Sequence, residues 1–253
     1  MKIKKIWPKI KWVLLLPLIF LIYVVISLFH ATLTDFQPPE KTLLNIQKRN
    51  ENNLITSPTL SFLNWNIGFA GLGEKSNFFY DSDQSFFFSN GKMVRSPEAF
   101  VDENLKGIID FIESNPTDFV LLQEVDRSSR RSYHRNQHEL ISARLNEYSQ
   151  HFALNYQVAR VIVPLLNPWN VLGKVASGLS SFSKFNPISS ERYQYPGKYN
   201  WPDYLFHLDR CMSVQRYPTS WVSDRELVVV NTHNSAYDGG HLKPKEMAYL
   251  KRF

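Results

Sequence analysis

Three segments decide the fold of this chain: Ser61–Gly68 reads SFLNWNIG, Asp118–Asp126 reads DFVLLQEVD, and Leu227–Asp238 reads LVVVNTHNSAYD. Each begins as an apolar run typical of a buried strand, and each ends in an amide, a carboxylate or an imidazole. These groups suit a divalent metal ion or a phosphate. If the three strand ends converge, Asn66, Glu124 and His233 surround one pocket.

The rest of the chain from Thr59 onward alternates strand and helix signals. Strands are predicted at Leu60–Ile67, Phe119–Leu122, Tyr156–Val163, Gly178–Phe185, Phe206–Arg216 and Glu226–Thr232. Helices are predicted from Ser96-Pro97 onward, with Ser96 as N-cap and Pro97 at the first helical position, at Gln137–Tyr148 and at Lys243–Phe253. This order predicts an α/β (α+β) fold with helical layers around sheets, not strict parallel βαβ units.

The segment from Gly68 to Arg95 is predicted to be a long loop rich in Gly, Asp, Ser and Phe. Asp81 and Asp83 are expected to form solvated turns, although they could also supply oxygen ligands. The run at 86–88, Phe-Phe-Phe, is expected to anchor the loop in the core, with lipid insertion as the alternative.

The N-terminus carries a membrane signal. Residues 12–29 are free of charge, with only Pro17 and Ser27 breaking the apolar run, and they follow five lysines. This predicts a basic cytoplasmic tail (1–11), a single-pass transmembrane anchor (12–29) and an extracytoplasmic domain. A cleaved signal peptide and a buried core helix are the alternatives. Residues 30–58 are predicted to be a linker, with a short helix near Thr42–Lys48.

Composition narrows the classes of function. The 253 residues suffice for one sizeable domain. Outside the five N-terminal lysines, 24 basic residues stand against 23 acidic ones, so the pI of 9.3 does not indicate a basic nucleic-acid-binding face. The single cysteine, Cys211, excludes a disulfide framework and a cysteine-based zinc site.

At these motifs the chain resembles the endonuclease/exonuclease/phosphatase superfamily of metal-dependent phosphoesterases. The resemblance covers residues 59–253 and rests on LNWNIG, LLQEVD, SGLSSFSKFNPI from Ser177, and VVNTHNSAYD. It implies a four-layer α/β/β/α sandwich with the site at one end, and a Mg²⁺ cofactor, with Mn²⁺ as the alternative. It also implies a phosphoester substrate: nucleic acid, a lipid head group or an inositol phosphate.

The resemblance assigns roles to five residues. Glu124 is the expected metal ligand, and Asn66 supports the metal or positions the phosphate. His233 is expected to donate a hydrogen bond to a phosphate oxygen. Tyr156 and Arg210 are weaker candidates for phosphate contacts. A core tyrosine and an Arg210–Asp209 ion pair are the structural alternatives.

The chain departs from the family pattern after the His233 motif. The family's Gly-Asp-x-Asn and Ser-Asp-His segments have no counterpart in the sequence. The sequence therefore predicts a C-terminally truncated member of the family, weakly active or inactive as it stands, whose complete form hydrolyses a phosphoester. The alternative function is a catalytically inactive binding module on the same fold. Oligomeric state is left open.

Overall fold

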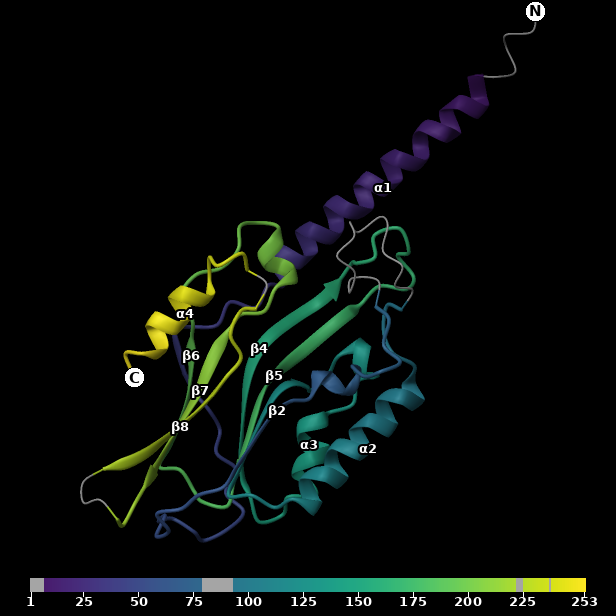
Figure 1. The fold of residues 1–253 in the computed structure, drawn as a ribbon. Helices are drawn as coiled ribbons and strands as arrows, with labels where there is room; N and C mark the ends of the chain where they lie inside the picture. Colours follow the sequence, from purple (N-terminus) through teal and green to yellow (C-terminus); the bar gives the residue numbers. More distant parts are fainter. Residues whose placement is uncertain (1–6, 79–92, 222–224, 237) are drawn as a thin grey trace, which may run out of the picture.

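The computed structural model describes residues 7–78, 93–221, 225–236 and 238–253, with side chains from residue 15 onward. Its domain is a mixed α/β structure built on two four-stranded sheets (Figure 1). The predictions for Asp81, Asp83 and the Phe run at 86–88, and those for the basic tail at 1–6, lie outside the described residues.

The first sheet carries two of the three deciding segments. Its strands run in the order β2-β3-β5-β4: β2 is Phe62–Asn66, β3 is Phe119–Asp126, β5 is Gly173–Ser183 and β4 is Ser149–Val161. β2 and β3 pair in parallel, and the other pairs are antiparallel. Parallel pairing places the carboxyl ends of β2 and β3, and therefore Asn66 and Glu124, at the same edge of the sheet.

The second sheet carries the third segment. It is antiparallel throughout, in the order β1-β6-β7-β8: β1 is Lys41–Leu43, β6 is Ser189–Gln194, β7 is Cys211–Pro218 and β8 is Glu226–Thr232. β8 matches its predicted bounds because the LVVV run, rich in β-branched valine, favours a strand, although only Val229 of that run is fully buried.

The two sheets face each other through aromatic and aliphatic side chains. Phe119 and Leu121 of β3 pack with Tyr217 of β7 and Val229 of β8, and the Phe119 and Tyr217 rings meet edge to face at 5.2 Å. The alternate residues of β3, such as Leu122, pack instead on helix α2. Both faces of β3 are therefore buried, which explains why its sequence is almost continuously apolar.

Helices cover the outer faces of both sheets (Figure 1). α2 (Glu98–Ser114) buries Val101, Leu105, Ile108 and Ile112 against the first sheet, the face that the helical spacing predicts. α3 is Gln137–Ser142, and α4 (Lys243–Leu250) contributes Tyr249 and Leu250 to a cluster on the second sheet. Short 3₁₀ turns occupy Gly68–Ala70, Arg130–Ser132 and Asp203–Phe206.

Several predicted boundaries are wrong. Ser96 does not cap α2: its hydroxyl donates to the Gly71 carbonyl, and Pro97 stands at the N-cap position. The helix predicted over Gln137–Tyr148 ends at Ser142. The strand predicted at Tyr156–Val163 begins seven residues earlier, because polar residues at its start face the partner sheet or pair with β5.

Residues 30–58, predicted to be a linker, run along the domain. The helix predicted near Thr42–Lys48 is wrong: Lys41–Leu43 forms β1 and pairs with β6. Farther on, Gln47 bridges to Gln150 of β4, and Ile55 is fully buried in the cluster between the sheets. The polar composition of this segment did not predict a strand, because β1 lies at the edge of its sheet and an edge strand buries little of its side-chain surface.

α1 (Trp7–Leu33) projects from the domain (Figure 1). Its stretch Leu15–Leu33 is long and apolar enough to cross a bilayer, and only 6% of it is buried. This exposure argues against a buried core helix. A membrane anchor and a signal sequence both fit an apolar helix of this kind.

Candidate functional site

Glu124 stands at the end of β3 in an unusual backbone conformation. Its φ is 54°, the left-handed region that non-glycine residues seldom adopt. The register between β3 and β5 shifts between Leu122 and Val125, so Glu124 occupies a bulge. Bulges re-aim side chains and are concentrated near functional sites, and strain of this kind persists only where the surrounding structure enforces it.

Asn66 and His233 meet the Glu124 carboxylate from two other strands. The Asn66 amide nitrogen donates to Glu124 Oε1 at 3.0 Å, and Nε2 of His233 lies 3.7 Å from the same oxygen. The Asn66 carbonyl accepts from the Gly68 backbone amide at 3.0 Å, which fixes the orientation of the amide. The structure thus brings together the three side chains that the sequence places far apart.

Asn231 joins the two sheets behind the site. Its Oδ1 accepts from Gln123 Nε2 at 2.7 Å, and its Nδ2 donates to the backbone carbonyls of Leu122 at 3.2 Å and Ser180 at 3.0 Å. Gln123 in turn donates to Asn64 of β2 at 2.8 Å. This buried network ties β8 to β2, β3 and β5, so it fixes where His233 emerges relative to Glu124.

Glu246 of α4 holds the loop that follows His233. Its carboxylate accepts from Asn234 Nδ2 at 3.1 Å, from the Ser235 amide at 2.8 Å and from the Ser235 hydroxyl at 2.6 Å. Glu246 is 1% exposed. Asp238 accepts from the first backbone amides of α4, and these hydrogen bonds lower its pKa to about 2.

Arg210 approaches the site from the start of β7. Its Nη1 donates to the His233 carbonyl at 3.3 Å. Burial lowers the pKa of Arg210, while the carboxylates of Glu246 and Glu124 act in the opposite direction. Arg210 is thus a cation beside the site. Within the described residues its guanidinium bonds to the His233 carbonyl and forms no ion pair with Asp209, the structural alternative for this residue.

Tyr156 lies away from this constellation. Its ring packs in an apolar cluster with Val158, Val161 and Val175, and burial raises its pKa. Among the described residues its side chain makes no hydrogen bond to Glu124, Asn66 or His233. Its position fits a core tyrosine, the structural alternative for this residue.

Burial keeps the His233 imidazole neutral. It lowers the His233 pKa to about 4, helped by the Arg210 cation and opposed by Glu124 and Glu246. Nδ1 of His233 is buried and has no hydrogen-bond partner in the described structure. A neutral ring beside a carboxylate retains one N–H donor for a ligand.

The donor set fits a hard cation that keeps most of its water. In the described residues, no three His, Cys, Asp or Glu side chains gather to hold a metal ion. Mg²⁺ needs fewer, because it binds through one or two carboxylates plus waters. Within the described structure Oε2 of Glu124 accepts no hydrogen bond, and the side chain is 22% exposed, so this oxygen is available as a ligand.

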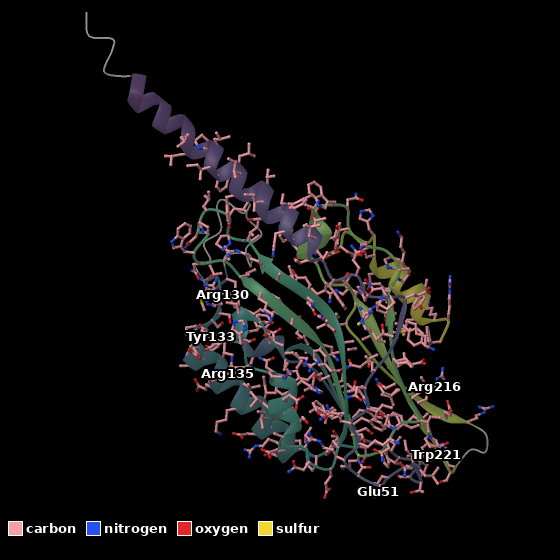
Figure 2. The ribbon with its side chains drawn as sticks, turned by 180° about the vertical axis from the view of Figure 1, so that it is seen from behind. Glu51, Arg130, Tyr133, Arg135, Arg216 and Trp221 are labelled. Carbon is pink, nitrogen blue, oxygen red and sulfur yellow. The ribbon has the colours of Figure 1, made fainter. Side chains whose placement is uncertain are left out.

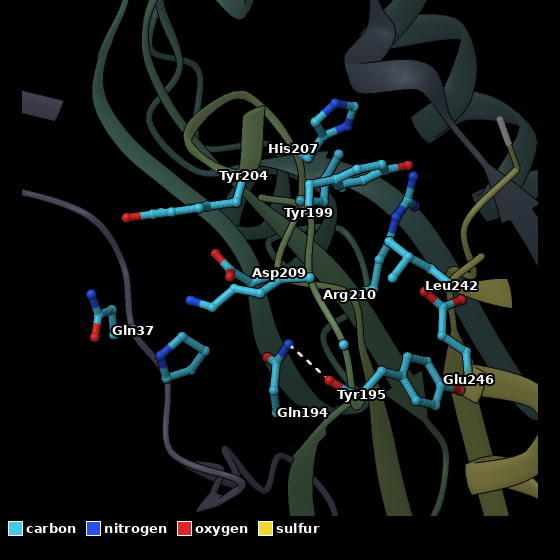
Figure 3. A pocket seen from close by; sticks show the side chains of 14 residues that line it. Gln37, Gln194, Tyr195, Tyr199, Tyr204, His207, Asp209, Arg210, Leu242 and Glu246 are labelled. Atoms are coloured by element: carbon cyan, nitrogen blue, oxygen red, sulfur yellow. Dashed lines mark hydrogen bonds between the residues drawn. The ribbon is translucent and has the colours of Figure 1, made fainter. Parts of the chain in front are cut away.

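Two hollows lie beside the constellation. One of about 540 Å³ is lined by Asn66, the turn that follows it and α2. The other, of about 280 Å³, contains Arg210, Glu246 and several tyrosines (Figure 3). In it, burial and the neighbouring Asp35 carboxylate raise the Asp209 pKa to about 7. Asn66 therefore borders the larger of these two hollows, and Arg210 borders the smaller one.

Sequence reasoning missed the residues that support the site. The sequence motifs do not single out Gln123 or Glu246. They indicate Asn231 and Asn234 only as residues that flank His233 and hold it, with loop hydrogen bonding as the alternative. A polar residue inside an apolar strand run, as in LLQEV and VVVNT, was the available signal for Gln123 and Asn231. Nothing in the local sequence around Glu246 indicates that α4 folds back onto the His233 loop.

No protein-family model matches the chain, and a search of curated proteins found no relative. Solved structures with a similar fold include an endonuclease/exonuclease/phosphatase from Beutenbergia cavernae, at 20% identity and a TM-score of 0.46, covering 76% of this chain and 42% of that one. A family protein from Leptotrichia buccalis has 11% identity, a TM-score of 0.47 and coverages of 77% and 63%.

A third similar structure is ANGEL2, described as a 2',3'-cyclic phosphatase, with 16% identity, a TM-score of 0.45 and coverages of 82% and 48%. The three structures belong to proteins that are longer than the part this chain matches. The chain spans from 42% to 63% of their length.

Proposed function

We propose that the domain is a membrane-anchored, Mg²⁺-dependent phosphoester hydrolase of the endonuclease/exonuclease/phosphatase type. One observation carries the proposal: side chains from the ends of β2, β3 and β8 meet at a single carboxylate oxygen of Glu124, at 3.0 Å from Asn66 and 3.7 Å from His233. The two facing sheets with helices outside them fit the four-layer sandwich of that superfamily.

The residues have complementary tasks. Mg²⁺ bound at this site would offset the negative charge of the phosphoester and polarise a phosphoryl oxygen. Glu124 would hold the ion through Oε2, and Asn66 fixes the Glu124 carboxylate by its amide. The neutral His233 ring would donate to a non-bridging oxygen as charge builds there. Arg210 adds a fixed positive charge beside the same position.

The N-terminal segment supports the membrane part of the proposal. Five lysines precede the apolar stretch of α1, and no lysine or arginine follows it until Lys41. By the positive-inside rule the N-terminus stays in the cytoplasm and the domain lies on the other side. With a nearly neutral domain, a lipid head group or an inositol phosphate suits this enzyme better than extended duplex nucleic acid.

A non-catalytic binding module is the second candidate. It is favoured by the sparse set of metal ligands around Glu124: among the described residues, no three His, Cys, Asp or Glu side chains gather to hold a metal ion. A module of this kind would bind a phosphoester with the same residues but would not turn it over.

Hydrolysis of bis(4-nitrophenyl) phosphate by the full chain in detergent tests the proposal. We expect weak Mg²⁺-dependent turnover that falls about 10²- to 10³-fold in Glu124→Gln or His233→Gln, since each loses a charge-stabilising contact. Glu147→Gln, an exposed carboxylate elsewhere on the surface, is the matched control. Absence of turnover, together with phosphoester binding that depends on Glu124, would overturn the enzyme proposal in favour of the binding module.

A further inference from the structure

The loop that connects β4 and β5 has an unusual composition for an exposed loop. Its 11 residues, 162–172, read IVPLLNPWNVL and contain no charged side chain, while Arg160 and Lys174 flank it. Leu166 is 75% exposed and Trp169 is 83% exposed. Scattered apolar residues on a surface are ordinary, but here two large ones stand three positions apart on one uncharged loop.

Two arginines donate hydrogen bonds to backbone carbonyls of the loop. Nη2 and Nη1 of Arg130 donate to the carbonyls of Trp169 and Val171, each at 3.3 Å. Nη2 of Arg160 donates to the Pro168 carbonyl at 2.9 Å. These hydrogen bonds fix the backbone of the loop between Pro168 and Val171, on either side of the exposed Trp169.

A third arginine adds to the positive charge. Arg95 and Arg160 are near enough to lower the pKa of Arg130, an effect second to its burial. Nη1 of Arg95 is buried and has no hydrogen-bond partner in the described part of the chain, so this arginine contributes its charge and not a free donor at that atom. Three guanidinium groups that repel one another concentrate positive charge near the loop, which favours an anionic group such as a phosphate.

The loop lies on the side of the domain from which α1 leaves. β4 points its C-terminal end toward that side, and α1 contacts β4 (Figure 1). The indole of Trp201, itself 58% exposed, donates to the Thr32 hydroxyl near the end of α1 at 3.1 Å. Arg130 lies toward this side of the domain, whereas Trp221 lies at the opposite end (Figure 2).

We propose that the β4–β5 loop is a membrane-binding surface, in which Leu166 and Trp169 enter the bilayer interface and Arg95, Arg130 and Arg160 bind phosphates of anionic phospholipids. Tryptophan is favoured at the level of the head groups, and a basic cluster near an anionic leaflet adds electrostatic attraction. The exposed apolar side chains of the loop, on the side of the domain from which α1 leaves, favour a bilayer over nucleic acid. This surface is separate from Glu124 and needs no catalysis.

A fluorophore at the loop tip tests the proposal. The full chain carries Trp169→Cys and is labelled there with an environment-sensitive dye; Cys211 is buried and does not compete for the label. The labelled protein is reconstituted into nanodiscs of phosphatidylcholine with or without phosphatidylglycerol. We expect a blue shift of the emission and quenching by doxyl-labelled lipid, both stronger with phosphatidylglycerol. The same label at Trp221→Cys, at the far end of the domain, should show neither effect.

The arginines are tested by substitution at the one that makes no hydrogen bond to the loop. Arg95→Gln should lower partitioning of the labelled loop into anionic bilayers about five-fold, and Arg95→Lys should restore it, because the attraction is to charge. Arg225→Gln, at the opposite end of the domain, is the control and should change nothing.

Four outcomes would overturn the proposal. They are an unquenched label at position 169 in both lipids, equal quenching at position 221, quenching that is indifferent to phosphatidylglycerol, and a spectral shift on adding a DNA oligonucleotide or inorganic phosphate without lipid.

Discussion

At the scale of single residues, the site depends on a strained carboxylate and on the polar groups that hold it. Glu124 is kept at φ 54° by the bulge in β3, and its Oε1 is shared by Asn66 and His233. Behind it, Asn231 satisfies a donor and two acceptors from two strands, β3 and β5. Strain at Glu124 is sustained because these buried contacts leave its strand little freedom.

Asn231→Ala should be strongly destabilising. It removes a buried acceptor of Gln123 Nε2 and the side-chain donor to the carbonyls of Leu122 and Ser180, and the loss of one such buried hydrogen bond costs about 1–3 kcal/mol. We therefore expect the free energy of unfolding to fall by about 3 kcal/mol, measured by urea unfolding of the full chain in detergent. Asn200→Ala, at an exposed position, should be neutral. A neutral result for Asn231→Ala would mean that the network does not join the sheets.

The sequence predicted the end of β8 correctly and that of β2 within one residue, because an apolar run that stops at a polar residue is visible locally. The predicted end of β3 at Leu122 was wrong, since the strand continues through polar residues to Asp126. Asn66, Glu124 and His233 could be singled out on that basis. Glu246 could not, since its partners Asn234 and Ser235 reach it only after α4 packs against the second sheet. Tyr156 was nominated from a motif, and its neighbours turn out to be apolar side chains.

At the scale of elements, the segment after α1 is part of the domain. Ile55 is fully buried between the sheets with Phe119 and Tyr217, and its backbone pairs with that of Thr219. Ile55→Ala should reduce the free energy of unfolding by about 2–5 kcal/mol, because it removes buried methyl groups and leaves a cavity. Leu54→Ala is the matched control, as Leu54 is 47% exposed. Equal melting of the two variants would restore the linker interpretation.

Elements with strong apolar periodicity were predictable, and those without it were not. β8 matches its predicted bounds, and α2 buries the predicted face. β6, whose sequence is SSERYQ, was missed because its polar residues lie in the interior of the second sheet and pair through their backbones with β1 and β7. β1 was mistaken for a helix for the same reason: pairing with a distant strand, not local propensity, determines it.

At the scale of the whole molecule, burial of two histidines makes the fold sensitive to acid. Burial lowers the pKa of His138 to about 3, with a smaller effect from Arg127 and Arg49. Burial also lowers the pKa of His151 to about 3, helped by His138. Because the unfolded chain binds protons more readily than the native one between pH 6.5 and about 3, stability falls as the pH is lowered through this range.

We expect each of these histidines to contribute a slope of up to about 1.4 kcal/mol per pH unit within that window. Urea unfolding of the full chain at several pH values measures the slope. His151→Met removes one titrating group and should flatten it, whereas His241→Gln, at an exposed position, should leave it unchanged. An identical slope in His151→Met and the unsubstituted chain would contradict this origin of acid sensitivity.

The most direct test of the account is whether the three converging strand ends bind one divalent cation. Titration of the full chain with Mn²⁺, followed by the loss of the free-ion EPR signal, should reveal one site that Mg²⁺ displaces. Binding should be lost in Glu124→Gln and kept in Glu147→Gln. Undiminished Mn²⁺ binding in Glu124→Gln, or no binding by the unsubstituted chain, would contradict the assignment of this site.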